Sequence, residues 1–373
     1  MTIAFDVSYI QSLRAGYGRF SLELLQGLLK NDQQNRYLLY GWSFSLDNKV
    51  LSGFNCDNVE LRTLRIPGFV KRLHWNTIRS PKLESLIGNF DIFHGAEPLL
   101  PPTAKATIAT VYDLAYKKYP QYFESNVLQW DSSIQRSLNG ANAIIVPSEN
   151  TKNDLIVFFT ISQDKIHVIH PPASDKFSPN KSERDEKIKE RYGINGEFIL
   201  FTGTFEPRKN IPFLIRGFEK FQENHKNVQL VLVGKPGWLD KDIFQSLRQS
   251  KASSNIKYLN YIEEDDLSAL YRSAIFFVYP SLYEGYGFPV IEAMASGTPV
   301  ITSKTSSLGE IACDAALLID PTNLNELVDA MDALYRNSAL RLELRDKGIL
   351  KTSHLTRETM AHTVIDIYKS IRS

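Results

Sequence analysis

Two glutamates eight residues apart, Glu284 and Glu292, belong to the stretch of this chain whose residue types point most directly to chemistry. Gly285 and Gly287 follow the first glutamate, and Pro289 stands where the first turn of a helix would begin. The backbone N–H groups and the dipole of a helix N-terminus favour an anion such as a diphosphate. Because a carboxylate repels an anion, we expect the glutamates to face sugar and ribose hydroxyls beside it. The alternative is that Glu284 caps the helix and Glu292 is exposed to solvent.

Two adjacent cations, Arg208 and Lys209, form a second candidate group. They lie in the turn between a strand predicted at 198–202 and a helix predicted at about 211–223, and α/β folds bind ligands at such turns. Two cations beside a helix N-terminus could balance the charge that grows on a departing diphosphate. No Asp-x-Asp motif follows a predicted strand, so we expect no metal, and we expect Lys209 at an exposed position. The alternative is a solvated surface pair.

The elements that must position these residues alternate regularly. Short apolar runs rich in β-branched and aromatic residues are separated by amphipathic helical segments, which predicts parallel sheets in an α/β fold. Pro171 and Pro172 end the first series, so we expect two doubly wound domains, 1–170 and 171–354, with a cleft between them. The predicted strands are at 3–6, 37–40, 59–64, 91–94, 106–111, 143–146, 165–169, 198–202, 229–233, 256–261 and 274–279, with another starting at 300.

Composition narrows the class of protein. The 373 residues carry 43 basic and 42 acidic side chains, a net charge of +1 that does not favour a nucleic-acid partner. Cys56 and Cys313, the two cysteines, lack metal-ligand spacing and suit a reducing compartment. Met1 leads directly into a strand-like run and no run of about 18 apolar residues occurs, so we expect a cytoplasmic protein without signal peptide or transmembrane helix. A basic, aromatic segment at 62–82 is interpreted either as a solvated face or as a patch that docks on anionic lipid.

The sequence from Ser281 to Val300, Ser-Leu-Tyr-Glu-Gly-Tyr-Gly-Phe-Pro-Val-Ile-Glu-Ala-Met-Ala-Ser-Gly-Thr-Pro-Val, closely resembles the signature of retaining GT-B glycosyltransferases of the bacterial "glycosyl transferases group 1" family, or family 4. The resemblance implies the GT-B architecture of two Rossmann-like domains, with a terminal helix, here at about 355–373, that packs back on the first. It implies that the first domain binds the acceptor and the second a nucleotide sugar. In the family the second glutamate, here Glu292, holds the donor ribose. The transferred hexose is held by the first glutamate and its loop, here Glu284, Gly285, Tyr286, Gly287, Phe288 and Pro289.

Further stretches resemble other donor-binding parts of the family. Gly-Thr-Phe-Glu-Pro-Arg-Lys-Asn at 203–210 resembles its diphosphate-binding turn, although many members have Gly-Arg where this chain has Gly203-Thr204. Arg208 is therefore expected to do more of the phosphate binding. The stretch at 258–267 resembles the one whose backbone recognises the nucleotide base. With two glycines of a loop expected before a helix at 20–29, the implied donor-binding residues are Gly16, Gly18, Thr204, Arg208, Lys209, Gly234, Lys235, Tyr261 and Ile262.

The first domain offers a candidate for orienting the acceptor or accepting its proton. Thr110-Val-Tyr112-Asp113 resembles a strand end that in the family usually carries His-Asp or His-Glu. Tyr112 replaces a histidine that touches the hexose in some relatives, so Asp113 remains as the candidate. The alternative is that Asp113 is a cap or turn residue. His94, at another strand end, is a weaker candidate.

Together these observations predict a retaining hexosyltransferase that acts without metal or cofactor, with Glu284, Asp113, Arg208 and Lys209 as catalytic residues. The resemblance implies a nucleotide-sugar donor, with UDP-glucose favoured over GDP-mannose, and a saccharide or lipid-linked saccharide acceptor in cell-surface polysaccharide or glycolipid synthesis. Peripheral contact with the inner face of the cell membrane is also expected. The alternatives are another GT-B activity, such as a sugar-phosphate synthase or a nucleotide-sugar epimerase, and a non-catalytic protein that binds a nucleotide sugar.

Overall fold

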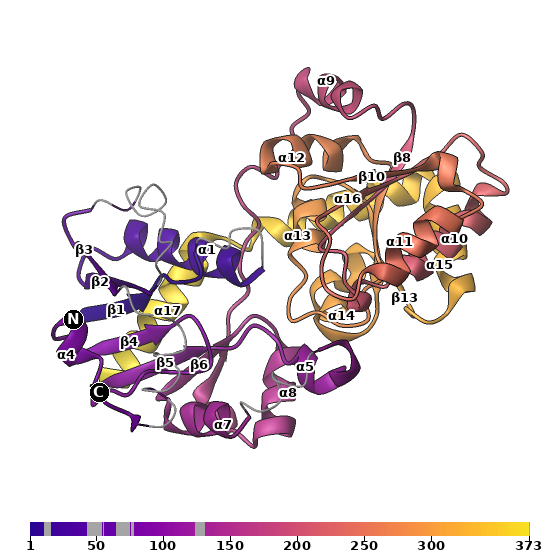
Figure 1. The fold of residues 1–373 in the computed structure, drawn as a ribbon. Coiled ribbons are helices and arrows are strands. Elements are labelled where there is room, and N and C mark those ends of the chain that lie inside the picture. Colours follow the sequence, from indigo (N-terminus) through magenta and orange to yellow (C-terminus); the bar gives the residue numbers. More distant parts are fainter. Residues whose placement is uncertain are drawn as a thin grey trace. The chain divides into compact units, whose positions relative to one another are not determined.

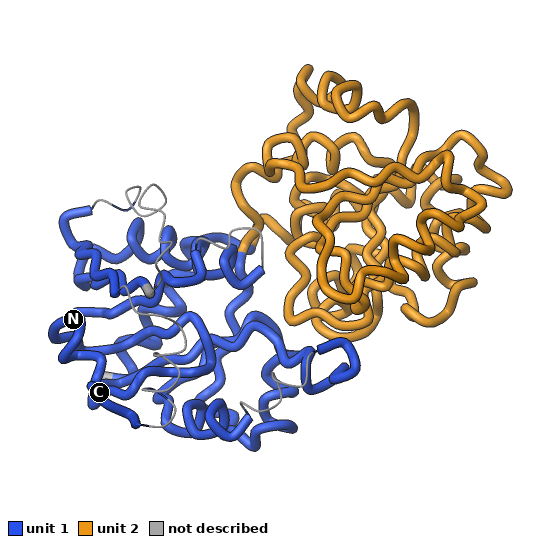
Figure 2. Tube along the Cα trace, in the orientation of Figure 1, with its two compact units in different colours: residues 1–171, 355–373 blue, residues 172–354 orange. Residues whose placement is uncertain are grey.

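The structure is a computed structural model that describes residues 1–10, 16–42, 54, 56–64, 75, 78–123 and 131–372. The chain divides into two units (Figure 2), of which unit 1 comprises Met1–Pro171 with Leu355–Ser373 and unit 2 comprises Pro172–His354. Of the basic segment predicted at 62–82, residues 65–74, 76 and 77 lie outside the described residues. No helix in the described part of the chain combines the length and the apolar character needed to cross a membrane.

Unit 1 is built on a seven-stranded sheet in the order β3-β2-β1-β4-β5-β6-β7. All neighbouring strands are parallel, as their apolar sequences predict. The order reverses between β1 and β4, which makes the carboxyl ends of these strands the switch point of a doubly wound sheet. The strands are β1 Thr2–Asp6, β2 Arg36–Trp42, β3 Val59–Leu64, β4 Ile92–Gly95, β5 Ala106–Thr110, β6 Ala143–Val146 and β7 Ile166–Val168.

The helices of unit 1 correct one prediction. Gly16 and Gly18 belong to the first turn of α1, not to a loop that precedes a helix starting at residue 20. Glycine costs a helix only about 1 kcal/mol per residue, and the burial of Phe20 and Leu24 outweighs that cost. The described helices are α1 Gly16–Asn31, α4 Glu84–Ile87, α5 Ala115–Lys118, α7 Asp131–Gly140, α8 Glu149–Phe159 and α17 Arg357–Arg372.

The C-terminal helix α17 completes unit 1 and packs along α1 (Figure 1). Gly27 permits this close approach, because a Cβ atom there would lie 2.5 Å from the backbone oxygen of Arg357. The Arg357 Nε donates to the buried carboxylate of Glu23 at 2.5 Å. At the other end of the helix, the Tyr368 hydroxyl and the Nδ1 of His94 share a buried hydrogen bond of 2.7 Å. Apolar packing and two polar pairs therefore fix the helix to α1 and to the sheet.

Unit 2 is built on a six-stranded parallel sheet in the order β10-β9-β8-β11-β12-β13. Every residue of the central strand β8 is buried, as expected for a continuous apolar run covered on both faces. The strands are β8 Phe198–Thr202, β9 Gln229–Val233, β10 Ile256–Leu259, β11 Phe276–Tyr279, β12 Val300–Ser303 and β13 Leu317–Ile319. The helices are α9 Arg184–Arg191, α10 Ile211–Gln222, α11 Lys241–Gln249, α12 Glu264–Ser273, α13 Phe288–Ala295, α14 Ser306–Ala312, α15 Leu324–Arg336 and α16 Ser338–Ser353.

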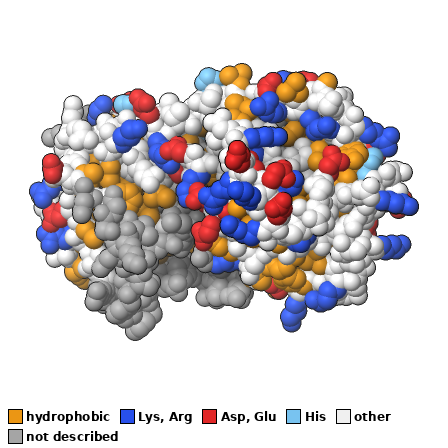
Figure 3. Space-filling view, turned by 90° about the horizontal axis from the view of Figure 1, so that it is seen from above, with side chains coloured by type: hydrophobic (Ala, Val, Ile, Leu, Met, Phe, Trp, Pro, Cys, Tyr) orange, Lys and Arg blue, Asp and Glu red, His pale blue; other side chains and the backbone are white. Residues whose placement is uncertain are grey.

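The charged side chains on the face seen in Figure 3 are mixed in sign. Basic and acidic residues are interspersed there rather than gathered into one large area of a single charge. This distribution agrees with the net charge of +1. Binding of nucleic acid is favoured by a large surface area of positive charge, and this face does not present one.

The buried His94 generates a prediction about pH. Burial lowers the pKa of His94 from 6.5 to about 3, so the folded protein keeps the ring neutral while the unfolded chain takes up a proton below pH 6.5. The free energy of unfolding should therefore fall as the pH drops from about 6.5 towards 3, by up to about 1.4 kcal/mol per pH unit from this group. Urea unfolding at pH 7 to 5 should show a shallower loss in His94→Gln than in the wild-type protein. The control is His362→Gln at an exposed position, and parallel losses in all three proteins would contradict the prediction.

Candidate active site

The carboxyl ends of four neighbouring strands bring the predicted donor-binding residues of unit 2 together. Because β10, β9, β8 and β11 are adjacent and parallel, the loops that follow them share one edge of the sheet. Residues 203–209 follow β8, and Gly234 with Lys235 follows β9. Tyr261 and Ile262 come after β10, and residues 284–289 come after β11. Residues spread over more than 80 positions of sequence therefore lie along one edge.

Backbone hydrogen bonds join these loops directly. The Phe205 N–H donates to the Lys235 carbonyl at 2.9 Å, which ties the turn after β8 to the loop after β9. The Leu282 N–H donates to the Arg208 carbonyl at 2.8 Å, which ties the same turn to the loop after β11. A Cβ atom at Gly234 would lie 1.8 Å from the Gly203 carbonyl oxygen, so only glycine permits this approach. The turn after β8 is thus held from both sides.

The carboxylate of Glu284 is the centre of the site. Its Oε1 accepts from the Lys209 Nζ at 2.5 Å, from the Ser281 Oγ at 2.7 Å and from the Tyr279 hydroxyl at 3.0 Å. Its Oε2 accepts from the Arg208 guanidinium at 2.6 Å. The residue is only 6% exposed. Two loops and the end of β11 therefore converge on one buried anion. The alternative that Glu284 caps the helix is wrong, because Gly287 occupies the N-cap position of α13.

Charge pairing keeps this buried carboxyl ionised. Burial alone raises the pKa of Glu284, but Arg208 and Lys209 outweigh it and lower the pKa to about 2. Burial and the neighbouring Arg208 lower the pKa of the Lys209 ammonium, while Glu284 opposes that shift. Glu206, which is 1% exposed, contributes a second carboxylate 2.5 Å from the Arg208 Nε. The cluster of Glu206, Arg208, Lys209 and Glu284 thus has two positive and two negative charges.

The burial of Lys209 corrects the prediction that it lies exposed. It is 7% exposed, and its ammonium also donates to the Tyr279 hydroxyl at 2.6 Å. The physical reason is that a carboxylate on the neighbouring loop compensates its charge, which permits a lysine to leave water. Arg208, whose side chain is 16% exposed, is the more accessible of the two cations.

Serines of α14 hold the glycine loop that follows Glu284. The Ser306 Oγ accepts from the Glu284 N–H at 3.1 Å, and the Ser307 Oγ donates to the carbonyls of Glu284 and Tyr286, each at 2.8 Å. Gly287 ends the loop with a φ of 113°, the left-handed region that suits glycine, and caps α13. The loop residues 283–288 are all buried, and Pro289 is half-buried in the first turn of α13.

Glu292 lies on α13 in a separate hydrogen-bond network. It is 2% exposed, and its Oε2 accepts from the Tyr271 hydroxyl at 3.1 Å. The Tyr271 hydroxyl also pairs with the Thr202 Oγ1 at 2.7 Å at the end of β8. The alternative of a solvated Glu292 is therefore wrong.

The loop after β10 presents an aromatic side chain. Tyr261 is 36% exposed, and the Lys235 Nζ lies 4.9 Å from its ring centroid. The backbone N–H of Tyr261 donates to the Asn260 side chain at 2.8 Å, so this donor is already used within the loop. Ile262 is buried behind it.

In unit 1 the structure places Tyr112 and Asp113 directly after β5. The Asp113 Oδ1 accepts from the Ala115 N–H at 3.0 Å, which is a turn contact as in the alternative that the sequence left, whereas Leu114 holds the N-cap position of α5. The Tyr112 hydroxyl pairs with the Ser21 Oγ of α1 at 2.9 Å, and burial raises the pKa of Tyr112. His94 lies inside the core, with its Nε2 3.3 Å from the Thr110 hydroxyl, and does not face a ligand.

Sequence reasoning missed five side chains at these edges. Glu206, Tyr279 and Ser281 belong to the Glu284 cluster, and Glu206 stood inside a motif that was already assigned. At the switch point of unit 1, the Tyr9 hydroxyl donates to the Glu97 carboxylate at 2.7 Å. Only a predicted strand order could have brought Tyr9 and Glu97 together.

Among the residues described, no group of three or more His, Cys, Asp or Glu side chains is arranged to hold a metal ion.

Comparison with known proteins identifies the family. The model described as "Glycosyltransferase Family 4" matches residues 15–176, and the one described as "Glycosyl transferases group 1" matches residues 184–351. This chain belongs to the group 1 glycosyltransferases. Among its relatives, the O-antigen chain mannosyltransferase B of Escherichia coli is 27% identical over 380 residues, covering 99% of this chain and 100% of the relative.

Solved structures show the fold of this glycosyltransferase. The sucrose-phosphate synthase of Thermosynechococcus elongatus matches with a TM-score of 0.77 at 18% identity, covering 100% of this chain and 99% of the other. Anabaena Alr3699/HepE in complex with UDP and glucose matches with a TM-score of 0.73 at 16% identity, covering 99% of each chain. At these identities the likeness concerns the fold, which is GT-B, as predicted from the sequence.

The buried cluster generates a prediction about stability. Lys209→Met removes one cation from Glu284 and should lower the free energy of unfolding by about 2–4 kcal/mol, as for a broken buried ion pair. Adding Glu284→Gln should cost less than the sum of the two single changes, because no uncompensated buried charge remains. Denaturant unfolding of the single and double variants measures this coupling. The matched control is Lys304→Met, whose ion pairs with Asp320 and Glu326 are exposed and should contribute under about 1 kcal/mol. Strictly additive effects of the two changes would exclude the coupling.

Proposed function

We propose that this glycosyltransferase moves a hexose from a nucleoside diphosphate sugar to a hydroxyl of a saccharide or lipid-linked saccharide, with retention of the anomeric configuration and without a metal. The observation that carries the proposal is the cluster of Arg208, Lys209 and Glu284 beside the start of α13. A helix N-terminus with nearby cationic donors suits a diphosphate, and a carboxylate that is ionised at neutral pH lies next to these cations, which supports the proposal. The product would enter cell-surface polysaccharide or glycolipid synthesis, and the reaction would take place at the cytoplasmic face of the inner membrane.

The ionisation of Glu284 limits the role that it can take. With a pKa of about 2 it holds no proton at neutral pH, so it cannot act as a general acid. It can stabilise the positive charge that develops on the hexose as the bond from C1 to the diphosphate oxygen breaks. In the front-face route that we favour, the acceptor oxygen bonds to C1 on the same face while its proton passes to the departing diphosphate. Hydrogen bonds from Arg208 and from the N–H groups of α13 stabilise that leaving group.

The remaining residues take supporting roles in the proposal. Glu292 holds the ribose, and the loops with Thr204, Lys235, Tyr261 and Ile262 surround the nucleotide. Asp113 of unit 1 orients the acceptor hydroxyl, and its contact with the Ala115 N–H fixes the carboxylate for this role. The basic segment at 62–82 supports a peripheral contact with the membrane.

The family resemblance and the named relatives favour different sugar donors. The sequence alone favoured UDP-glucose over GDP-mannose. The full-length relative is named a mannosyltransferase, and this favours a mannosyl donor, so we propose GDP-mannose first and UDP-glucose as the second candidate.

The experiment that tests the function is turnover with each donor. Purified protein with a lipid-linked saccharide acceptor should transfer mannose from GDP-mannose, and hydrolyse it slowly without acceptor. Turnover should persist in excess EDTA, since the donors of Arg208 and the N-terminus of α13 would hold the diphosphate without a metal. Faster turnover with UDP-glucose would reverse the order of the donors. Complete loss in EDTA with rescue by Mg²⁺ or Mn²⁺ would remove the metal-free mechanism, and no turnover of any nucleotide sugar would favour the non-catalytic alternative.

The two glutamates should separate in their effects on binding and turnover. Glu284→Gln should reduce turnover severely while affinity for the free nucleoside diphosphate is retained or increased, because the cations lose a competing carboxylate. Glu292→Gln should weaken the free nucleotide and the nucleotide sugar alike, since a ribose contact is present in both. Calorimetry beside steady-state kinetics measures both quantities. Nucleotide binding lost in Glu284→Gln by more than about threefold, about 0.7 kcal/mol, and kept in Glu292→Gln would reverse the assignment.

A further inference from the structure

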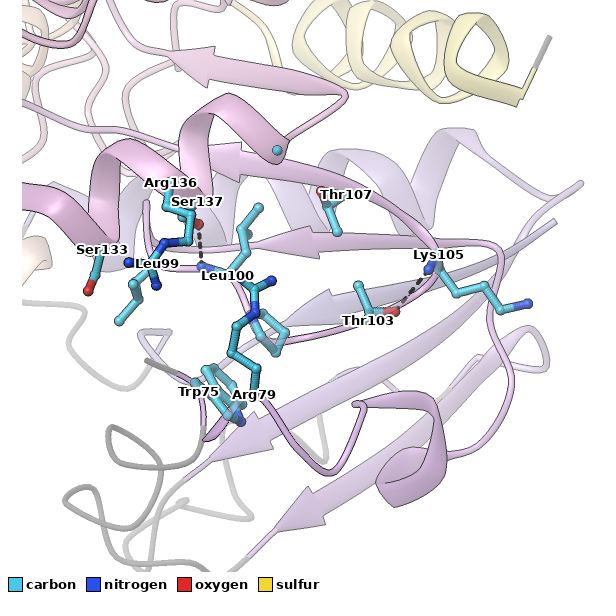
Figure 4. Close-up of a pocket in the computed structure, with 12 residues that line it drawn as sticks. Trp75, Arg79, Leu99, Leu100, Thr103, Lys105, Thr107, Ser133, Arg136 and Ser137 are labelled. Atoms are coloured by element: carbon cyan, nitrogen blue, oxygen red, sulfur yellow. Dashed lines mark hydrogen bonds between the residues drawn. The ribbon is translucent and has the colours of Figure 1, made fainter. Parts of the chain in front are cut away.

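A hollow in unit 1 is lined by none of the residues assigned to catalysis, and Figure 4 shows the side chains around it. Its volume of about 120 Å³ has room for a group of several non-hydrogen atoms. One wall is a face of α7, where Ser133, Arg136 and Ser137 recur at the spacing of three or four residues that places side chains together on a helix. The other walls come from the start of β5, from the loop between β4 and β5, and from Trp75 and Arg79.

Two guanidinium groups line this hollow. Arg79 and Arg136 reach it from separate parts of the chain, whereas the side chain of Lys105 extends away from them in Figure 4, and no Asp or Glu is among the described residues that line it. Thr103, which also lines it, donates its hydroxyl proton to Glu84 on α4 at 2.7 Å. Like charges gathered in a hollow repel each other and raise the local concentration of anions. The arrangement therefore favours a bound anion.

Hydroxyl groups add neutral donors to the cations. In Figure 4 the backbone N–H of Leu100 donates to the Ser137 Oγ at 2.8 Å. This bond uses a lone pair of the oxygen, so the hydroxyl proton remains for a ligand oxygen. Ser133 contributes a second hydroxyl on the same helix face. Planar guanidinium groups with nearby hydroxyls are the chemistry that recognises phosphate oxygens.

The position of the hollow separates it from the candidate acceptor residue. Lys105 and Thr107 lie at the amino end of β5, whereas Asp113 follows its carboxyl end. At about 3.3 Å per residue, the six residues from Thr107 to Asp113 span roughly 20 Å. An anion held here is therefore distinct from a group reacting at Asp113.

We propose that this hollow binds a phosphate or diphosphate group, either free in solution or carried by an anionic lipid. The proposal rests on the lining of the hollow and does not depend on the donor or on glycosyl transfer. It gives the membrane-facing interpretation of the basic segment a defined site, to which Trp75 and Arg79 of that segment contribute.

The test compares two double variants of the full chain that lose the same net charge. Arg79→Gln and Arg136→Gln together change the hollow. Arg36→Gln and Lys369→Gln together change exposed cations elsewhere in unit 1 and serve as the control. One arm measures inorganic pyrophosphate by calorimetry. The other measures co-sedimentation with vesicles of phosphatidylglycerol in phosphatidylcholine, beside vesicles of phosphatidylcholine alone, at low and high salt.

The hollow variant should bind its phosphate ligand at least about tenfold more weakly than the control, which should match the wild-type protein. Any pyrophosphate held by Arg208 and Lys209 in unit 2 contributes equally to all three proteins. A difference in both arms supports a general phosphate site, a difference with vesicles alone identifies the lipid as the source, and a difference with pyrophosphate alone identifies a free anion. Arg136→Lys, which keeps the charge, should retain part of the binding. Equal binding by the hollow variant and the control in both arms would overturn the proposal.

Discussion

One buried carboxylate, compensated by two cations from another loop, is the constraint on which the ligand-binding edge of unit 2 depends. Glu284 comes from the loop after β11, and Arg208 and Lys209 come from the turn after β8. Neither loop can move away without leaving uncompensated charge in a poorly solvated place, and that would cost several kcal/mol. The cluster therefore fixes the relative position of two loops before any ligand arrives. Preorganised charges of this kind need no rearrangement during a reaction.

The balance of charge within the cluster has a consequence for binding. Glu206 and Glu284 already neutralise the two cations, so the ion pairs by themselves leave no net positive charge to attract a diphosphate. The attraction must come from the geometry of individual donors, such as the partly exposed guanidinium of Arg208, and from the N-terminus of α13. The site should accordingly select ligands by shape and hydrogen bonding more than by total charge.

Much of this architecture could be predicted from the sequence, and the failures have physical causes. The alternation of apolar runs and helices predicted two parallel sheets, and the spacing of Glu284 and Glu292 around a glycine loop predicted a ligand site. The burial of Lys209 could not be predicted, because it depends on a carboxylate 75 residues away. The start of α1 at Gly16 depends on tertiary packing that outweighs local propensity. Tyr9 and Glu97 meet only because β1 and β4 are neighbours, and a sequence does not state strand order.

The return of the last helix to unit 1 bears on how the protein is made. Glu23 and Arg357 are 334 residues apart, yet they form one buried pair. A ribosome synthesises the segment carrying α17 only after the whole of unit 2, long after the strands of unit 1 have emerged. Until then the face of α1 around Gly27, and His94 in the core, lack their partners. The second unit, whose residues are contiguous, can fold on the nascent chain first, so the amino-terminal unit is the last to be finished and the one that most needs protection during translation.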